Sequence, residues 1–274
     1  MFDALTDKYK NRFTFVNNDF ANLESIIKEN NKTLVSGGIV ADLGVSSFQL
    51  DDSERGFSFN KDGPLDMRMS GEGVTAQELI YSLDEKALAK ILWDYGDEEK
   101  SRAIAKMIIK ERNKEILDTT FKLVKIIKRV KKSDRKGKNH PATKSFQALR
   151  IATNDEFTEL YEALFAAEKA LRSGGILAIV TFHSLEDRIV KRFLQLRSGS
   201  AGNSNRYAPE INNEEKHFEI VNRKAIIASD QELLQNPRSR SAKLRIAKRL
   251  SCQPGRNLLP SQLGVPLLEG KNNA

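Results

Sequence analysis

Hydrophobic residues follow two spacings along the chain, and each spacing predicts one kind of element. The continuous apolar run 176–180 is typical of a strand buried on both faces. Shorter apolar or alternating runs predict further strands at 13–16, 39–41, 217–221 and 244–247. Apolar residues three or four positions apart predict helices near 23–27, over 75–115 with a break near Gly96, over 121–138, over 146–171 and over 188–196.

The order of these elements predicts an α/β fold with a doubly wound, mainly parallel sheet, because buried strands alternate with helices. A purely helical block from about residue 68 to 143 follows the strand that ends at Asp42, so it is expected to be an insertion. We therefore expect three parts: a discontinuous sheet domain of residues 1–67 and 144–250, a helical insertion of residues 68–143, and an irregular tail of residues 251–274.

The polar segment 42–69 is the most informative part of the chain. It is rich in acids and glycines, and it directly follows the strand predicted at 39–41. A carboxylate at the carboxyl end of a strand, followed by a polar loop, is typical of ligand sites in open α/β sheets. From this context alone Asp42 is about as well explained as a turn or capping residue.

Composition and charge narrow the possible partners. The 274 residues carry a formal net charge of +8, with a sequence pI near 9.4, which favours a polyanion partner such as nucleic acid. No apolar run is long enough to span a membrane, and the first residues have no signal-peptide core, so a cytoplasmic protein is expected. One cysteine and three scattered histidines give no metal-binding spacing, and no metal is expected.

The positive charge is concentrated in two segments. Residues 122–138 contain nine lysines and arginines against the single acid Asp134, which favours contacts with RNA phosphates over a simply solvated helix face. A second basic cluster covers 238–249, where the alternation of lysine and arginine with apolar residues also suits an exposed strand edge.

The segment 183–187 contains a histidine, a serine and two acids, as a hydrolase does. Neighbouring residues do not make a catalytic triad without a separately positioned partner. Ser184 as a helix N-cap, with Asp187 three residues later, is the better explanation.

Four segments, at 42–69, 140–156, 174–193 and 236–249, together resemble the bacterial 16S ribosomal RNA cytosine-N4 methyltransferase (RsmH/MraW) family over roughly residues 10–250. The resemblance implies a Rossmann-like class I methyltransferase sheet with an inserted all-helical subdomain for substrate recognition. It also implies S-adenosylmethionine as the methyl donor, and the exocyclic N4 amine of a decoding-centre cytosine in the small ribosomal subunit as the substrate.

The resemblance also suggests site residues. Phe20, Asp42 and Gln49 match positions that contact the donor, and Asp42 is the candidate for orienting the reacting amine. Residues expected to bind RNA or substrate are Arg55, Asp66, Arg68, Lys128, Arg129, Lys131, Lys132, His140 and Arg150. The acids and arginines of the 54–68 loop are at least as well explained by ion pairs among themselves, with no role in binding. His140 is also explained as a helix cap.

The chain differs from the family pattern near its start. The family has a glycine-rich segment with Gly-Gly-His and then an acid for the donor's ribose, and neither occurs in this sequence. We therefore expect an N-terminally incomplete sheet, weak donor binding, and an exposed sheet edge with apolar surface that favours aggregation. The start of the chain is then either misassigned or truly shortened.

Two other functions are alternatives to RNA methylation. The leading one is a non-catalytic RNA-binding remnant or ribosome-assembly factor. As for oligomeric state, a homodimer is one expectation. A DNA amino-methyltransferase is disfavoured, because its Asn-Pro-Pro-aromatic type of turn is replaced by Asp42-Leu43-Gly44-Val45.

Overall fold

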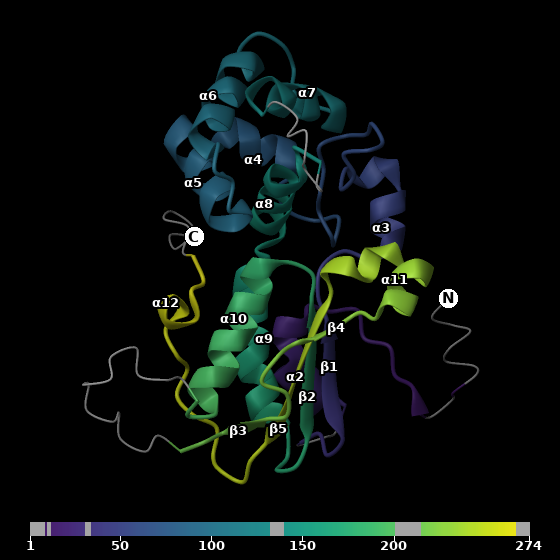
Figure 1. The fold of residues 1–274 in the computed structure, drawn as a ribbon, viewed down its shortest axis with the longest axis vertical. Helices are drawn as coiled ribbons and strands as arrows, with labels where there is room; N and C mark the ends of the chain where they lie inside the picture. Colours follow the sequence, from purple (N-terminus) through teal and green to yellow (C-terminus); the bar gives the residue numbers. More distant parts are fainter. Residues whose placement is uncertain (1–8, 10–11, 31–33, 132–139, 201–214, 267–274) are drawn as a thin grey trace. The chain divides into compact units, whose positions relative to one another are not determined.

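The computed structural model describes residue 9 and residues 12–30, 34–131, 140–200 and 215–266, drawn in colour in Figure 1. The chain forms two compact units. The first consists of Met1–Leu43 and Thr158–Val265, and the second contains Gly44–Phe157. Each unit has its own buried apolar residues.

The first unit is built on a mixed five-stranded sheet. Its strands are β1 (Gly38–Asp42), β2 (Ile176–Thr181), β3 (Phe218–Ile220), β4 (Ile226–Ile227) and β5 (Lys243–Arg249). The order is β1-β2-β5-β3, with β4 also paired to β5. Strands β1 and β2 are parallel, in a register that places Asp42 opposite Val180. Strand β5 is antiparallel to its neighbours β2, β3 and β4.

Helices pack against this sheet (Figure 1). Helix α10 (Ser184–Arg197) contacts β2, β3 and β5, and α12 (Pro260–Leu263) contacts α10. The unit also contains the short η2 (Phe20–Asn22), α2 (Leu23–Glu29), α9 (Glu156–Ala170), and the neighbouring pair α11 (Asp230–Gln235) and η4 (Pro237–Ser241). Phenylalanine rings from α9, α10 and β3 contact one another. The ring centroids of Phe165 and Phe193 are 5.4 Å apart, and those of Phe193 and Phe218 are 5.9 Å apart. These buried contacts give the unit its core.

The strand predictions need three corrections. Residues 13–16 form no strand. Strand β2 alternates between buried and half-buried residues, so only one of its faces is fully covered. Strand β5 lies inside the sheet between β2 and β3, so its alternation does not mark an exposed edge, and its antiparallel direction makes the sheet mixed. Local pattern could not reveal this because strand direction depends on distant pairing partners.

The second unit is helical. It contains α3 (Ser47–Asp51), η3 (Ser53–Arg55), α4 (Ala76–Ser82), α5 (Glu85–Gly96), α6 (Ser101–Arg112), α7 (Thr120–Val130) and α8 (Thr143–Asn154). Helix α5 packs against α6 and α8, and α6 packs against α7. The predicted break near Gly96 is confirmed. A side chain at Gly96 would meet the Lys144 carbonyl oxygen at 2.5 Å, so glycine is what lets α5 approach α8.

The boundaries of the helical unit differ from the expected range 68–143. The loop 44–67 belongs to it because that loop bonds to the start of α7: Leu65 N donates to Asp118 O, and Thr120 N donates to Gly63 O. Helix α8 belongs to it because it packs against α5. The single helix expected over 146–171 is two helices, since Asp155 adopts a left-handed conformation with φ of 50° that ends α8.

The described part of the tail, up to Pro266, is mostly irregular, as expected, apart from α12. It is attached to the first unit by buried polar groups. Gly255 N donates to Glu168 Oε1 at 2.7 Å, and Arg197 Nε lies 2.7 Å from Glu168 Oε2. Among the described residues, no helix has the length and apolar character needed to cross a membrane.

Candidate functional site

Asp42 and Phe20 line the same cavity in the first unit. The cavity has a volume of about 240 Å³, and its walls come from η2, α2, β1, β2 and α9. Apolar side chains such as Leu23, Ile39 and Leu164 form most of the lining. Of the described residues that line it, Asp42 alone carries a charge. The cavity therefore offers an apolar floor with one carboxylate at the end of a strand.

The sheet places Asp42 there. Asp42 is the last residue of β1, and the next residue continues the pairing, since Leu43 N donates to Val180 O at 3.1 Å. The carboxyl ends of the parallel strands β1 and β2 meet at one edge of the sheet, which is where open α/β sheets bind ligands. Phe20 is 44% exposed at the start of the helical turn η2, so its ring is accessible.

Gln49 belongs to the second unit, and its side chain caps helix α3. Gln49 Oε1 accepts from Ser46 N at 2.9 Å, while Gln49 N donates to Ser46 Oγ at 3.3 Å. This reciprocal capping box is readable from the spacing Ser46-x-x-Gln49, a signal that the sequence analysis missed. Donor contact by Gln49 remains a prediction.

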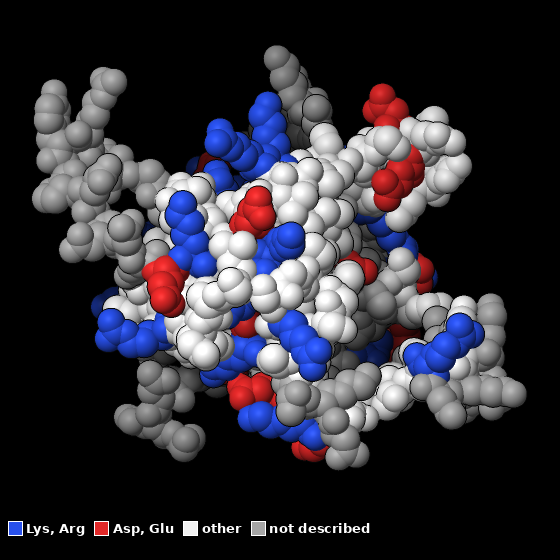
Figure 2. Space-filling model, turned by 90° about the horizontal axis from the view of Figure 1, so that it is seen from below, with Lys and Arg blue, Asp and Glu red and all other residues white. Residues whose placement is uncertain are grey.

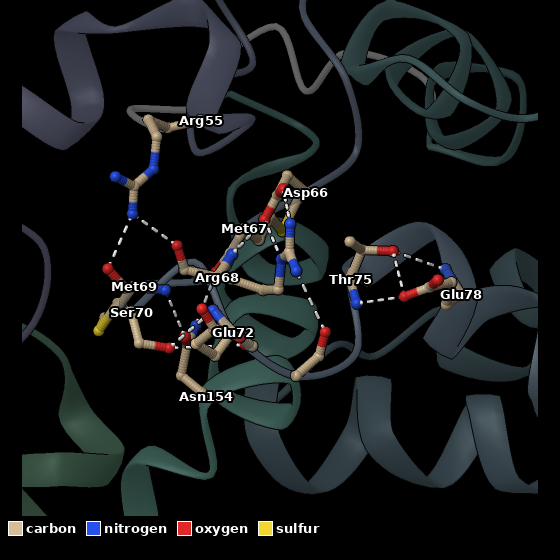
Figure 3. Close-up of polar contacts among 11 residues, drawn as sticks. Arg55, Asp66, Met67, Arg68, Met69, Ser70, Glu72, Thr75, Glu78 and Asn154 are labelled. Atoms are coloured by element: carbon tan, nitrogen blue, oxygen red, sulfur yellow. Dashed lines mark hydrogen bonds and ion pairs between the residues drawn. The ribbon is translucent and has the colours of Figure 1, made fainter.

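The loop residues Asp66 and Arg68 form a bidentate ion pair, drawn in Figure 3. Arg68 Nε and Nη2 donate to the two carboxylate oxygens of Asp66 at 2.9 and 2.7 Å. The hydrogen bonds from Arg68 outweigh the effect of burial and lower the pKa of Asp66. Arg55 Nη2 donates to the carbonyls of Arg68 and Met69 at 2.7 and 2.8 Å. In this structure the charged side chains of the loop therefore bind one another and the loop backbone. This is one of the two interpretations that the sequence left open.

Asn154 completes this network, and the sequence analysis missed it. Asn154 Oδ1 accepts from Met69 N, and its Nδ2 donates to Met67 O, both at 2.7 Å (Figure 3). Met67 is fully buried with a left-handed φ of 61°, which is costly for a residue with a side chain. Asn154 therefore holds a strained turn in place. No local pattern predicts it, because its partners are 85 and 87 positions away.

The described part of the basic stretch has more acidic partners than its sequence suggests. Lys122 lies 2.7 Å from Asp118, Arg129 lies 2.8 Å from Glu111, and Lys131 lies 2.9 Å from the buried Glu98. The expectation of almost no compensating acids is therefore wrong. Glu98 and Glu111 come from the α5–α6 region, which only packing brings to α7. Lys132 lies outside the described residues.

Arg150 and His140 also have local partners. Arg150 Nε and Nη2 donate to Glu156 at 2.7 and 2.8 Å, and both side chains are largely buried. His140 Nδ1 accepts from Ala142 N at 3.3 Å just before α8, but the N-cap of α8 is Ala142, so His140 is not the helix cap that the alternative expected. Its ring stacks on Phe59, with centroids 4.6 Å apart. Whether any of these residues contacts RNA remains a prediction.

The second basic cluster is divided: Arg238, Arg240 and Lys248 are exposed, whereas the other three cations have internal partners. Arg245 and Lys243 donate to Asp187, and the buried Arg249 donates to the carbonyls of Glu168 and His217. Figure 2 shows lysines and arginines interspersed with acids and uncharged surface on the face it draws, so that face has no single basic patch. The N-cap of α10 is His183, paired with Glu186, and not Ser184 with Asp187 as expected.

The sequence pattern of the MraW methylase family matches residues 3–250. The chain belongs to the MraW methylase family. Similar relatives are named ribosomal RNA small subunit methyltransferase H. The one from Roseobacter denitrificans is 53% identical over 235 residues, covering 86% of this chain and 71% of the relative. The one from Cereibacter sphaeroides strain KD131 is 54% identical over 234 residues, covering 85% and 70%. The one from Parvibaculum lavamentivorans is 45% identical over 270 residues, covering 97% and 79%.

Membership of the MraW methylase family confirms the resemblance noted in the sequence, and the mixed sheet with helices agrees with the methyltransferase fold expected from it. This family takes its methyl group from S-adenosylmethionine. The cavity of the first unit fits part of that donor. An adenine ring suits the apolar lining and the accessible ring of Phe20, and a positively charged group of the donor suits the carboxylate of Asp42.

Proposed function

We propose that this chain methylates the exocyclic N4 amine of a decoding-centre cytosine in 16S ribosomal RNA, with S-adenosylmethionine as the donor. The observation that carries the proposal is the shared cavity of Phe20 and Asp42 at the carboxyl end of β1. The names of the similar relatives support the substrate class. The proposed partner is the small ribosomal subunit in the cytoplasm, and a homodimer remains a prediction.

In this proposal Phe20 and Asp42 hold the donor, with Gln49 as a further contact. S-adenosylmethionine, when bound, supplies a methyl group on a positively charged sulfur. Asp42 accepts a hydrogen bond from the cytosine amine, which orients the amine and offsets the positive charge that develops on its nitrogen. Amine methylation depends chiefly on alignment and exclusion of water, so no histidine or cysteine nucleophile is required.

The proposal is tested by replacing Asp42. Asp42→Asn and Asp42→Ala are expected to lower the methyl-transfer rate at least about a hundredfold, by analogy with the loss of one preorganised hydrogen-bonding group that stabilises transition-state charge. The measurement follows transfer from radiolabelled donor, at millimolar concentration, to small subunits isolated without the modification. Glu219→Gln serves as the control, because Glu219 is an exposed acid of the same sheet that does not line the cavity.

Near-normal turnover by Asp42→Ala would overturn the role of Asp42. Calorimetry on the same proteins measures donor affinity. Weak donor binding by the chain remains a prediction that this measurement tests. RNA binding without any methyl transfer at high donor concentration would favour the alternative function of a non-catalytic RNA-binding factor.

A further inference from the structure

The second unit contains a basic cavity of about 690 Å³ that the proposed reaction does not use. It is bordered by helix α7, by Phe59 and Asn60 of the loop between η3 and α4, and by His140 just before α8. Among the described residues that line it, Lys125, Lys128 and Arg129 are cationic and none is acidic. Its charge is therefore complementary to a phosphate.

Helix α7 separates its cations into two groups. Phe121, Lys125 and Lys128 are spaced four and three positions apart, so they share one face of the helix, and this face borders the cavity. Lys122 and Arg129 form ion pairs with Asp118 and Glu111. Lys125 and Lys128 are exposed and have no ion pair within the described ranges. These two lysines are therefore the ones available to an external anion.

Aromatic rings form the other part of the cavity wall. Phe59 stacks on His140 with an angle of 4° between the rings, and it meets Phe146 edge-on at a centroid distance of 5.7 Å. These contacts fix the wall. Phe121 differs, because it is 47% exposed and borders the cavity. An exposed ring beside two lysines is the combination that proteins use to bind single-stranded nucleic acid, stacking a base and contacting its phosphate.

His140 adds an uncharged hydrogen-bond donor. Burial, with smaller contributions from the charges of Lys128 and Lys131, lowers the pKa of His140, which favours the neutral ring near pH 7. Since Nδ1 accepts from Ala142 N, the proton of the neutral ring is assigned to Nε2. Asn60 supplies an amide. A neutral imidazole and an amide suit the uncharged edge of a base better than a second phosphate.

We propose that this cavity binds one nucleotide of the RNA substrate other than the methylated cytosine, with its phosphate on Lys125 and Lys128 and its base stacked on Phe121. The inference rests on the proposed RNA substrate and deepens it by naming a second contact point. Such a contact fixes the position of the RNA without entering the chemistry.

The phosphate contact is tested with the full chain carrying Lys125→Gln and Lys128→Gln. Its affinity is measured for a single-stranded oligoribonucleotide with the sequence around the target cytosine, at several salt concentrations. The slope of log affinity against log salt is expected to fall by about 0.7 for each lysine lost, with affinity about tenfold weaker at low salt. The control carries Lys106→Gln and Lys110→Gln on exposed positions of α6 outside the cavity. Equal losses in both double variants, or no loss in either, overturn the proposal.

The stacking contact is tested with 2-aminopurine in the same oligoribonucleotide, since stacking on a ring quenches its fluorescence. Phe121→Leu is expected to lose the quenching while keeping the salt slope, and Phe121→Tyr is expected to keep both. Heparin tests whether the cavity takes any polyanion. If heparin competes fully and Phe121→Leu changes nothing, the cavity is a general anion site and the nucleotide assignment is wrong.

These readouts separate this proposal from the proposed function. If RNA binding depends on Lys125 and Lys128 but the chain transfers no methyl group, the nucleotide-binding role of the cavity is supported and the proposed methyltransferase activity is contradicted. Methyl transfer with no contribution from these lysines to RNA affinity overturns the cavity assignment alone.

Discussion

Asp187 lies in a nearly buried site in which its carboxylate accepts three hydrogen bonds. Arg245 Nε and Nη2 donate at 2.6 and 3.1 Å, and Lys243 Nζ donates at 3.2 Å. The Asp187 side chain is 12% exposed, so little water replaces these partners if they are lost. At the scale of single residues, charged side chains of this protein often form ion pairs within the chain. Asp66 with Arg68 and Glu98 with Lys131 are two examples.

Asp187 gives a prediction on pH dependence. Burial acts to raise the pKa of Asp187, but the hydrogen bonds and charges of Arg245 and Lys243 outweigh burial and lower it. The folded state then favours the ionised form more than the unfolded chain does. The stabilisation is full above the ordinary aspartate pKa of about 3.9 and is lost as the pH falls through the lower folded value.

Asp187→Asn is therefore expected to reduce the free energy of unfolding by about 2 kcal/mol at pH 7. Its effect should shrink progressively below about pH 4, where the Asp187 carboxylate of the unfolded wild-type chain begins to protonate while the folded one is still ionised. Urea unfolding across this range measures the difference, with Glu219→Gln as an exposed control. A loss that stays constant down to the acid limit of the folded state would contradict the ion-pair explanation.

At the scale of elements, β1 forms one edge of the described sheet, pairing only with β2 among the residues that the structure describes. Val40, in the middle of β1, is 75% exposed. An apolar edge strand with unpaired backbone groups is prone to pair with another chain.

Val40→Lys is expected to reduce self-association, because a charged side chain on an edge strand disfavours pairing between chains. Static light scattering at increasing protein concentration measures the effect. Leu234→Lys is the matched control, since it also replaces an exposed apolar side chain by lysine, but on helix α11. If both variants reduce scattering equally, general surface hydrophobicity is responsible and the sheet edge is not.

At the scale of the whole molecule, the chain has two cores in sequence-discontinuous units. Leu177 of β2 is buried in the first unit, and Leu92 of α5 is buried in the second. Units with separate cores can open separately, which breaks simple two-state unfolding.

Leu177→Ala and Leu92→Ala are each expected to cost about 2–5 kcal/mol in their own unit, as large-to-small changes in a packed core do. Native-state hydrogen exchange measured by mass spectrometry should show faster exchange in the unit that carries the substitution and little change in the other. Each variant serves as the control of the other. Uniformly faster exchange throughout the chain, in both variants, would mean that the two units unfold together.

Much of the local structure follows from the sequence alone. The apolar spacing of α5, α6 and α7 and the apolar runs of β1 and β2 predicted these elements, because helix and strand periodicity record which face is buried. The position of Asp42 at the end of β1 was also predictable, since the run 39–41 stops there. The motifs of the four segments 42–69, 140–156, 174–193 and 236–249 together indicated the MraW methylase family.

Only the tertiary structure decided which residues meet. It made β5 an inner antiparallel strand, assigned acids from the α5–α6 region to the cations of α7, and joined Asn154 to the strained turn at Met67. The physical reason is the same in each case. Hydrogen bonds and ion pairs form between groups that lie close in space, and the side-chain partners here are 18 to 87 positions apart, so no local spacing records them.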